Sequence, residues 1–275
     1  MSSDNFTDFA EDLITDYFTG GGLSLPADFR VGLASAASDS SITELSGTGY
    51  ARQLYTRSLA NWAGTQGPTT TLASSGTSQA TSNNVAINFG TSGSAWGTAN
   101  YVVLYDNSGN ALSYHALRSP QVIGSSASVV IPIGGISATV SLSGGATNYT
   151  VNKFIDLWFR GQAFSWPAIG YFALFTTAPS NAGGGVEVSG GAYVRQSINF
   201  DTTDLSATAG VISNNVSIAF PTPTAAWGTI GDEGVFDSLS GGNLLFWNPL
   251  DEPRTVLTGS SPQTHAVGSW SIAVT

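Results

Sequence analysis

The 275-residue chain has only 9% charged residues and a net charge of −10, and its eight lysines and arginines are too few to form a groove that follows a phosphate backbone. We therefore exclude nucleic acid as a partner, and the same shortage of cations excludes an anionic membrane surface. The chain contains no cysteine, which also excludes disulfides, thiolate metal sites and cysteine nucleophiles.

The first segment, residues 5–19, predicts a short amphipathic helix. Its apolar residues recur at steps of three and four: Phe6, Phe9, Leu13 and Tyr17. Glycines at 20–22 end this helix, and a second one is predicted from Asn148 as N-cap to Gly161 as the stop. The N-terminus is acidic and no apolar run approaches the roughly 18 residues of a membrane span, so we expect neither an export signal nor a membrane helix.

A ten-residue stretch after the first helix occurs twice. Glu44-Leu-Ser-Gly-Thr-Gly-Tyr-Ala-Arg-Gln53 returns as Glu187-Val-Ser-Gly-Gly-Ala-Tyr-Val-Arg-Gln196, at an offset of 143 residues. Three further pairs follow in the same order at an offset of 131: Ser82-Asn-Asn with Ser213-Asn-Asn, Ala95-Trp-Gly-Thr98 with Ala226-Trp-Gly-Thr229, and Val103-Leu-Tyr-Asp106 with Gly234-Val-Phe-Asp237. We interpret this as a tandem duplication, with a first domain over residues 1–145 and a second over residues 146–275.

The change of offset means that the first copy carries about a dozen extra residues, which we place near residues 61–81. This stretch has no apolar period and is typical of a surface loop. The alternative is a contact arm for a neighbouring subunit.

Only strand patterns follow each predicted helix. In the first copy they cover residues 29–34, 50–56, 85–89, 101–105, 111–117, 127–133 and 137–142; in the second they cover 171–176, 193–200, 216–220, 234–236, 243–248, 265–267 and 269–274. Short strands at this spacing, separated by Gly, Asn and Ser turns, predict an antiparallel sandwich or barrel. The expected fold is thus mainly β: two tandem antiparallel β-sandwich or barrel domains, each with one short N-terminal α-helix.

The acidic residues that recur between the copies have structural explanations. We expect Glu44 to pair with Arg52, and Glu187 with Arg195, across a turn next to Tyr50 and Tyr193. Asp106 and Asp237 begin tight turns, in which an aspartate normally bonds its own backbone. The less favoured alternative is a pair of carboxylates that hydrolyses a glycoside.

Trp96 and Trp227 each stand in an Ala-Trp-Gly-Thr stretch at a strand entry, so core packing with a bonded indole N–H is favoured over an exposed sugar platform. Neither His115 nor His265 belongs to a metal-spaced or catalytic set. We therefore predict no catalytic residue, no metal and no cofactor. We interpret ten repeated residues as structural: Glu44, Tyr50, Arg52, Trp96 and Asp106 in the first copy, and Glu187, Tyr193, Arg195, Trp227 and Asp237 in the second.

The second copy resembles a family of short bacteriophage proteins described as tail-fibre or minor tail proteins, of which a typical member looks like one such unit. The resemblance rests on Ala173-Leu-Phe-Thr176, on the stretch from Glu187 to Gln196, on Ala226-Trp-Gly-Thr229 and on Gly241-Gly-Asn-Leu-Leu-Phe246. The first copy departs from the pattern at Gly32-Leu-Ala-Ser35, at Gly109-Asn-Ala-Leu112 and in its insertion.

This resemblance implies a non-enzymatic structural protein of a tailed-phage virion, with other virion proteins as partners. We expect a tail, tail-tip or fibre component whose duplicated domains make symmetric contacts, in a trimer that presents six similar units. Two alternatives stay open: a capsid decoration protein, and a module that binds a host receptor or carbohydrate through exposed aromatics such as Trp62 or Trp166.

Overall fold

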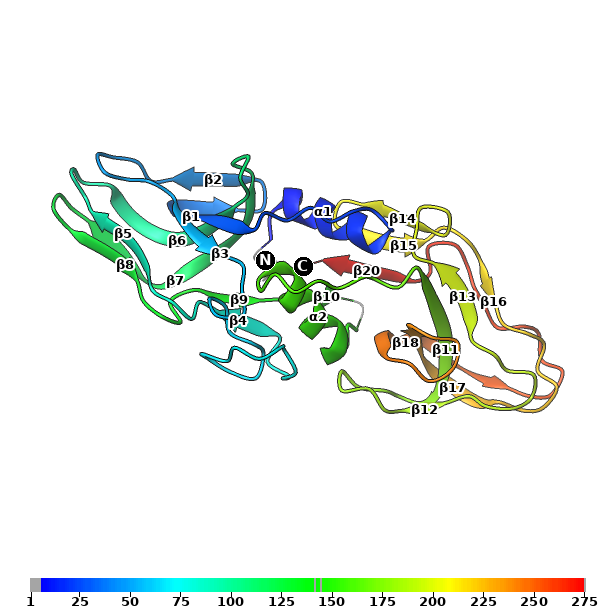
Figure 1. The fold of residues 1–275 in the computed structure, drawn as a ribbon. Helices are drawn as coiled ribbons and strands as arrows, with labels where there is room; N and C mark the ends of the chain where they lie inside the picture. Colours follow the sequence, from blue (N-terminus) through cyan, green and yellow to red (C-terminus); the bar gives the residue numbers. More distant parts are fainter. Residues whose placement is uncertain (1–5, 141, 144, 275) are drawn as a thin grey trace.

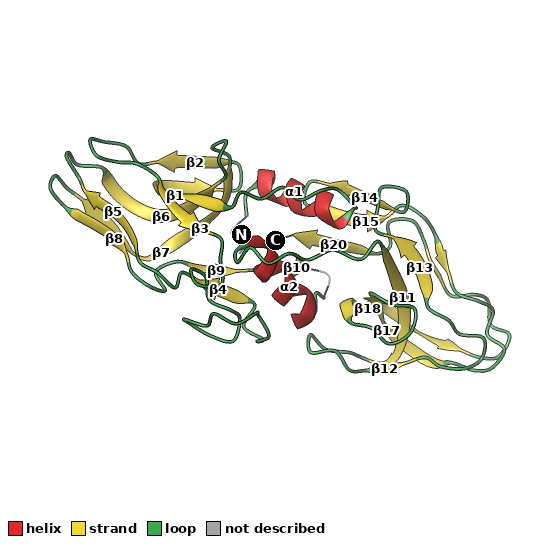
Figure 2. Cartoon of the chain, in the orientation of Figure 1, coloured by secondary structure: helices red, strands yellow, loops and turns green. Residues whose placement is uncertain are grey.

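The computed structural model describes residues 6–140, 142–143 and 145–274. The chain forms two similar halves, each a helix followed by antiparallel strands, and both helices lie between the two large sheets (Figures 1 and 2). The helices are α1 (Asp8–Phe18) and α2 (Asn148–Trp158). The predicted N-cap at Asn148 is wrong: Thr147 has the extended backbone of a cap, and its hydroxyl accepts a hydrogen bond from the backbone N–H of Thr150.

The first half has one large sheet and two small ones. The large sheet has the order β2-β1-β6-β7, with β3 also paired to β1, and the small sheets are β4-β9 and β5-β8. The bounds are β1 (Asp28–Ser38), β2 (Ser41–Glu44), β3 (Gln53–Thr56), β4 (Ala80–Ser82), β5 (Ile87–Thr91), β6 (Gly97–Tyr105), β7 (Ala111–Ile123), β8 (Ser128–Ile131) and β9 (Ser137–Thr139).

The second half repeats this plan with the order β12-β11-β17-β18, with β13 paired to β11, and with the small sheets β16-β19 and β10-β20-β15-β14. Its strands are β10 (Leu142–Ser143), β11 (Ile169–Thr177), β12 (Val186–Glu187), β13 (Gln196–Asn199), β14 (Leu205–Thr208), β15 (Val211–Asn214), β16 (Ile218–Ala219), β17 (Gly228–Phe236), β18 (Leu244–Val256), β19 (Thr264–His265) and β20 (Ser271–Val274). Strand β10 comes from the end of the first half but pairs with β20 of the second.

Alternating burial shows how each large sheet is covered. In β1 the side chains of Phe29, Val31 and Leu33 enter the main core, where they meet Ile87 and Ile131 from the small sheet β5-β8. This period of two is what a sheet with one fully covered face requires. The arrangement is layered, and none of the sheets in the described part of the chain closes into a barrel.

Each helix begins in its own half and reaches into the other. The backbone N–H of Thr7 bonds the carbonyl of Leu112 in β7, and the N–H of Thr147 bonds that of Leu245 in β18. Beyond these anchors, α1 contacts β14 and β20 of the second half. In return, the side chain of Arg57, which follows β3, donates hydrogen bonds to the last carbonyls of α2.

The glycines at the ends of the two helices, Gly20 and Gly161, each contact the other half at an equivalent place. Gly20 packs so closely that an added Cβ would lie 3.0 Å from the carbonyl oxygen of Phe200, and a Cβ on Gly161 would lie 2.4 Å from that of Arg57. Both have positive φ, which glycine adopts without strain. Arg57 and Phe200 hold the same position after β3 and β13, so the halves are paired in the isologous manner of a two-fold dimer.

The insertion near residues 61–81 is a folded loop that lies against α2 of the same chain. Asn152 bonds both the hydroxyl of Thr65 and the carbonyl of Gly76. Trp62, at the start of the insertion, is completely buried. The insertion therefore has contacts with the other half, while many of its residues between 66 and 79 are exposed, as in a surface loop.

One continuous hydrophobic cluster includes α1, α2 and strands of both halves, for example Ile14, Phe154 and Ile272. The sequence boundary between residues 145 and 146 therefore lies inside a shared core, and the separation into two domains stays a prediction. No helix among the described residues is long and apolar enough to cross a bilayer.

Candidate functional site

The duplicated stretch forms a closed cluster in the first half. Arg52 contacts both carboxylate oxygens of Glu44, at 2.9 Å from Nε to Oε1 and 2.7 Å from Nη2 to Oε2. The hydroxyl of Tyr50 donates to Glu44 Oε1 at 2.8 Å and accepts from the backbone N–H of Leu33. The guanidinium of Arg52 lies 3.4 Å from the ring centre of Tyr105, which adds a cation–π contact.

The second half builds the same cluster from Glu187, Tyr193 and Arg195. The corresponding distances to the carboxylate are 2.9 Å from Nε and 2.7 Å from Nη2 of the arginine, and 3.0 Å from the tyrosine hydroxyl. Arg195 also donates to the carbonyls of Ser238 and Gly241, which ties the cluster to the turn that begins at Asp237. Both predicted ion pairs are therefore present.

The bonding of these residues decides what they can do. Burial alone would raise the pKa of Glu44, but hydrogen bonds from Arg52 and Tyr50 outweigh it and hold the pKa below its ordinary value. Burial raises the pKa of Tyr50 above its ordinary value. Both carboxylate oxygens are bonded and the guanidinium is stacked, so the cluster acts as a fastening between strands.

The repeated tryptophans and aspartates are structural too. Trp96 and Trp227 are 4% and 5% exposed, and each indole N–H donates at 3.0 Å to a carbonyl of the duplicated turn. Asp106 accepts from the backbone N–H of Asn110, and Asp237 from that of Asn243, as predicted for turns. The buried position of Trp62 rules it out as a sugar platform.

A second polar assembly holds the halves together. Arg160, at the end of α2, is fully buried, pairs with Asp156 at 2.6 Å and donates to the carbonyls of Trp62 and Leu72 in the insertion. The sequence gives no sign of this arginine's partners in the insertion, because Trp62 and Leu72 lie 98 and 88 residues earlier in the chain.

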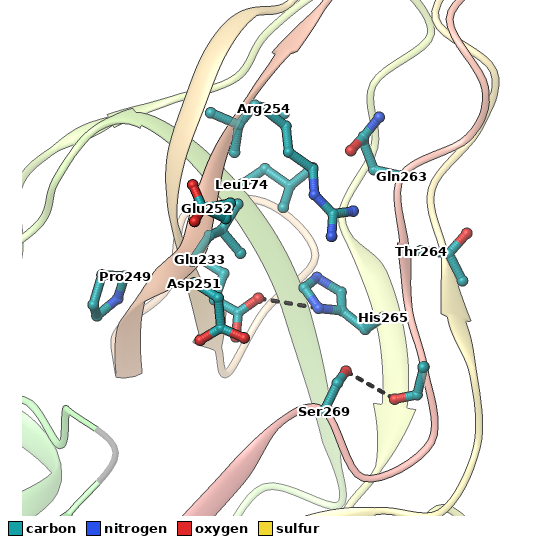
Figure 3. A pocket seen from close by; sticks show the side chains of 13 residues that line it. Leu174, Glu233, Pro249, Asp251, Glu252, Arg254, Gln263, Thr264, His265 and Ser269 are labelled. Atoms are coloured by element: carbon teal, nitrogen blue, oxygen red, sulfur yellow. Dashed lines mark hydrogen bonds and ion pairs between the residues drawn. The ribbon is translucent and has the colours of Figure 1, made fainter.

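The second half also contains a polar cavity of about 260 Å³ between β17, β18 and β19 (Figure 3). Glu233 projects from β17 toward His265 of β19, and its Oε2 lies 3.1 Å from the imidazole Nδ1. Arg254 and Asp251, both exposed on β18, also line the cavity. This is where ionisable groups of several strands converge.

The cavity shifts the titration of both buried groups. Burial, reinforced by the charge of Asp251, raises the pKa of Glu233 to about 8. Burial and the nearby Arg254 lower the pKa of His265 to about 4. At neutral pH both side chains are therefore uncharged, and Glu233 Oε2 makes no hydrogen bond.

Comparing the two copies at the offset of 131 residues would have found Glu233 opposite Val102, whereas the place of His265 follows from the strand registers. In the strand registers, Glu233 takes the place of Val102, which pairs with β7 as Glu233 pairs with β18. His265 takes the place of Ile131, since both pair with the isoleucine that opens the facing strand. The first half thus has two fully buried apolar side chains where the second has an acid and an imidazole.

Among the described residues no three His, Asp or Glu side chains are placed to hold a metal ion together. The other buried histidine, His115, contacts only the hydroxyl of Ser113 through its Nε2, and burial lowers its pKa to about 4. The cavity beside Glu233 is therefore a site for hydrogen bonds and charge, not for a metal held by three such ligands.

Comparison with known proteins agrees with the duplication. A family model described as "Podophage GP4 fiber I protein gp80" matches residues 5–139 and 145–272. The two matched segments follow the two halves and together cover nearly the whole chain. None of the curated proteins matches the sequence.

Proposed function

Since the chain belongs to the podophage fiber I protein family, it is a phage tail-fibre structural component, and we propose that it serves there without catalysis, through assembly contacts that its two halves repeat. As a fibre protein it is a component of the virion and assembles with other virion proteins. We also propose that it is a tail, tail-tip or fibre-associated component, and the tail label of the resembling proteins supports this.

The observation that carries the proposal is the duplicated Glu-Tyr-Arg cluster. Glu44 and Glu187, the acids that recur in this motif, are bonded by an arginine and a tyrosine in the same geometry, so both are used to fasten strands. Conserving this fastening in both halves keeps two similar surfaces in shape. Rigid, uncharged polar surfaces of this kind suit repeated contacts between protein subunits.

The near two-fold pairing of the halves bears on the expected trimer. We propose that three chains present six similar units, in which the near two-fold relation within each chain connects its two units.

Mass determination of the purified chain tests the oligomer, and a map of purified particles tests its place. We expect a mass of three chains in solution and density for multiples of three chains at the tail fibres. A chain that stays monomeric at high concentration and is missing from particles would overturn the assembly role. Hydrolysis of a host glycan that disappears in Glu187→Gln would overturn the non-enzymatic assignment.

A further inference from the structure

The polar cavity beside Glu233 differs from its counterpart in the other half by chemistry, not by fold. The surrounding strands β17, β18 and β19 have the same pairing as β6, β7 and β8 of the first half. Val102 and Ile131 show that a well-packed apolar pair is compatible with this place. An acid and an imidazole here make folding less favourable, because buried polar groups lose their hydration. A ligand that forms hydrogen bonds with Glu233 or His265 would replace the bonds to water that these side chains lose on folding.

Glu233 is the residue that indicates the ligand. Its side chain is 7% exposed, it lines the cavity, and its Oε2 has no hydrogen bond. A buried carboxyl oxygen without a hydrogen bond is energetically unfavourable, and an N–H or O–H group of a ligand could donate to it. His265 at 3.1 Å is not aligned to supply one.

The charges around the cavity select a cation. Asp251 and Glu252 line its β18 side, and Arg254 is the single permanent cation among the lining residues (Figure 3). Arg254 is exposed, and no hydrogen bond connects it to Glu233. Once Glu233 is ionised, its carboxylate and that of Asp251 outweigh the one guanidinium, so the site attracts positive charge and repels anions.

The size and the donor set narrow the class of cation. No three carboxylate or imidazole groups are placed to coordinate a metal ion within the described chain. A cavity of about 260 Å³ admits an alkyl chain with a charged end. An ammonium group has three N–H donors, enough to bond Glu233 Oε2 and still reach the carboxylate of Asp251.

We propose that this cavity binds a primary alkylammonium group, as found on a polyamine or on a lysine side chain of a partner protein, with Glu233 as its buried counterion. The ammonium enters between Asp251 and Glu252, and Glu233 gives up its proton to the solvent as the cation binds. Arg254 competes with the ligand, because its positive charge acts on the same carboxyl group.

Isothermal titration calorimetry of the full-length protein tests the proposal with two probes, putrescine and N-acetyl-lysine methylamide. We expect saturable binding to both, with close to one proton released per ligand at pH 7, measured from the dependence of the heat on the buffer's ionisation enthalpy. Affinity should rise roughly tenfold per pH unit as the pH approaches 8, because ionisation of Glu233 is coupled to binding. Tighter binding of putrescine indicates a free polyamine, and tighter binding of the lysine probe indicates a partner's side chain.

Variants make the assignment specific. Glu233→Gln should weaken binding roughly tenfold or more and abolish proton release. Arg254→Gln should strengthen binding by removing the competing charge. Asp12→Asn, an exposed carboxylate on α1, is the matched control and should change neither quantity. If Glu233→Gln does not fold, Asp251→Asn serves in its place and should weaken binding.

The proposal is overturned by any of three results: no saturable binding of either probe at millimolar concentration, binding that Glu233→Gln leaves unchanged, or binding that Arg254→Gln abolishes.

Discussion

Replacing the buried pair of the second half by its counterparts from the first, in the double variant Glu233→Val/His265→Ile, should stabilise the protein and remove a specific part of its pH dependence. The registers place both new side chains where Val102 and Ile131 are fully buried in the first half. The substitution therefore preserves the apolar character and approximate volume that this fold accepts at these positions.

The magnitude follows from the pKa of Glu233, which rises from 4.5 to about 8 on folding. A carboxyl group whose pKa is raised in the folded state contributes stability below its unfolded pKa and loses that contribution as the pH rises through the folded value. One unit of pKa is worth about 1.4 kcal/mol, so the full loss is about 5 kcal/mol. Between pH 4.5 and 6.5 the neutral His265 opposes this trend, because its pKa is lowered from 6.5 to about 4.

The informative window is therefore pH 7 to 9, where the histidines are largely neutral in both states and Glu233 is the group that titrates. Urea unfolding followed by tryptophan fluorescence should show that the wild type loses about 1 kcal/mol of unfolding free energy across this window. The double variant should lose almost none, and at pH 8 it should be about 1–4 kcal/mol more stable than the wild type. The exposed Asp12→Asn on α1 is the control and should follow the wild type. A double variant that loses stability in parallel with the wild type, or that is less stable at pH 8, would refute the reasoning.

Three further changes address the other polar assemblies. Arg160→Met leaves Asp156 buried without its cation and should lower the unfolding free energy by about 3–5 kcal/mol in urea; a loss below 1 kcal/mol would show that the contact between insertion and α2 is dispensable. Glu44→Gln should cost about 1 kcal/mol at neutral pH and flatten the fall of stability below pH 4.5, because its lowered pKa makes the charged form the stabilising one; an unchanged acid profile would contradict this. Gly161→Ala puts a methyl group 2.4 Å from the carbonyl oxygen of Arg57 at a positive φ and should lower the thermal midpoint by the equivalent of about 2 kcal/mol or more, whereas Gly22→Ala, in open space, should have a small effect.

Local patterns predicted both helices, many of the strands and the ion pairs of the duplicated stretch. The three- and four-residue steps of Phe6 and its neighbours gave α1, and the turn glycines of the duplicated stretch preceded β3 and β13. The pairing of Glu44 with Arg52 was also predictable, since both residues belong to one turn and lie only eight positions apart. Such features depend on interactions within a short segment, which the sequence displays directly.

The contacts that each helix makes with the other half could not be predicted from local sequence patterns. Each helix has an apolar face, but that face does not specify which of two similar sheets it covers. Several strands were also missed: β2 and β12 are short, and β14 lies in a stretch that is polar along most of its length. Tertiary pairing, not local propensity, makes these segments strands.

By itself, the sequence determined that this chain is a duplicated, mainly β protein whose recurring acids fasten turns, because motif spacing and residue type carry that information along the chain. Only the tertiary structure decided that α1 and α2 cross to the opposite halves, that the insertion is held by Arg160, and that Glu233 meets His265 across a cavity. Each of these contacts joins segments distant in sequence, and its partners are selected by how two almost identical units pack against one another.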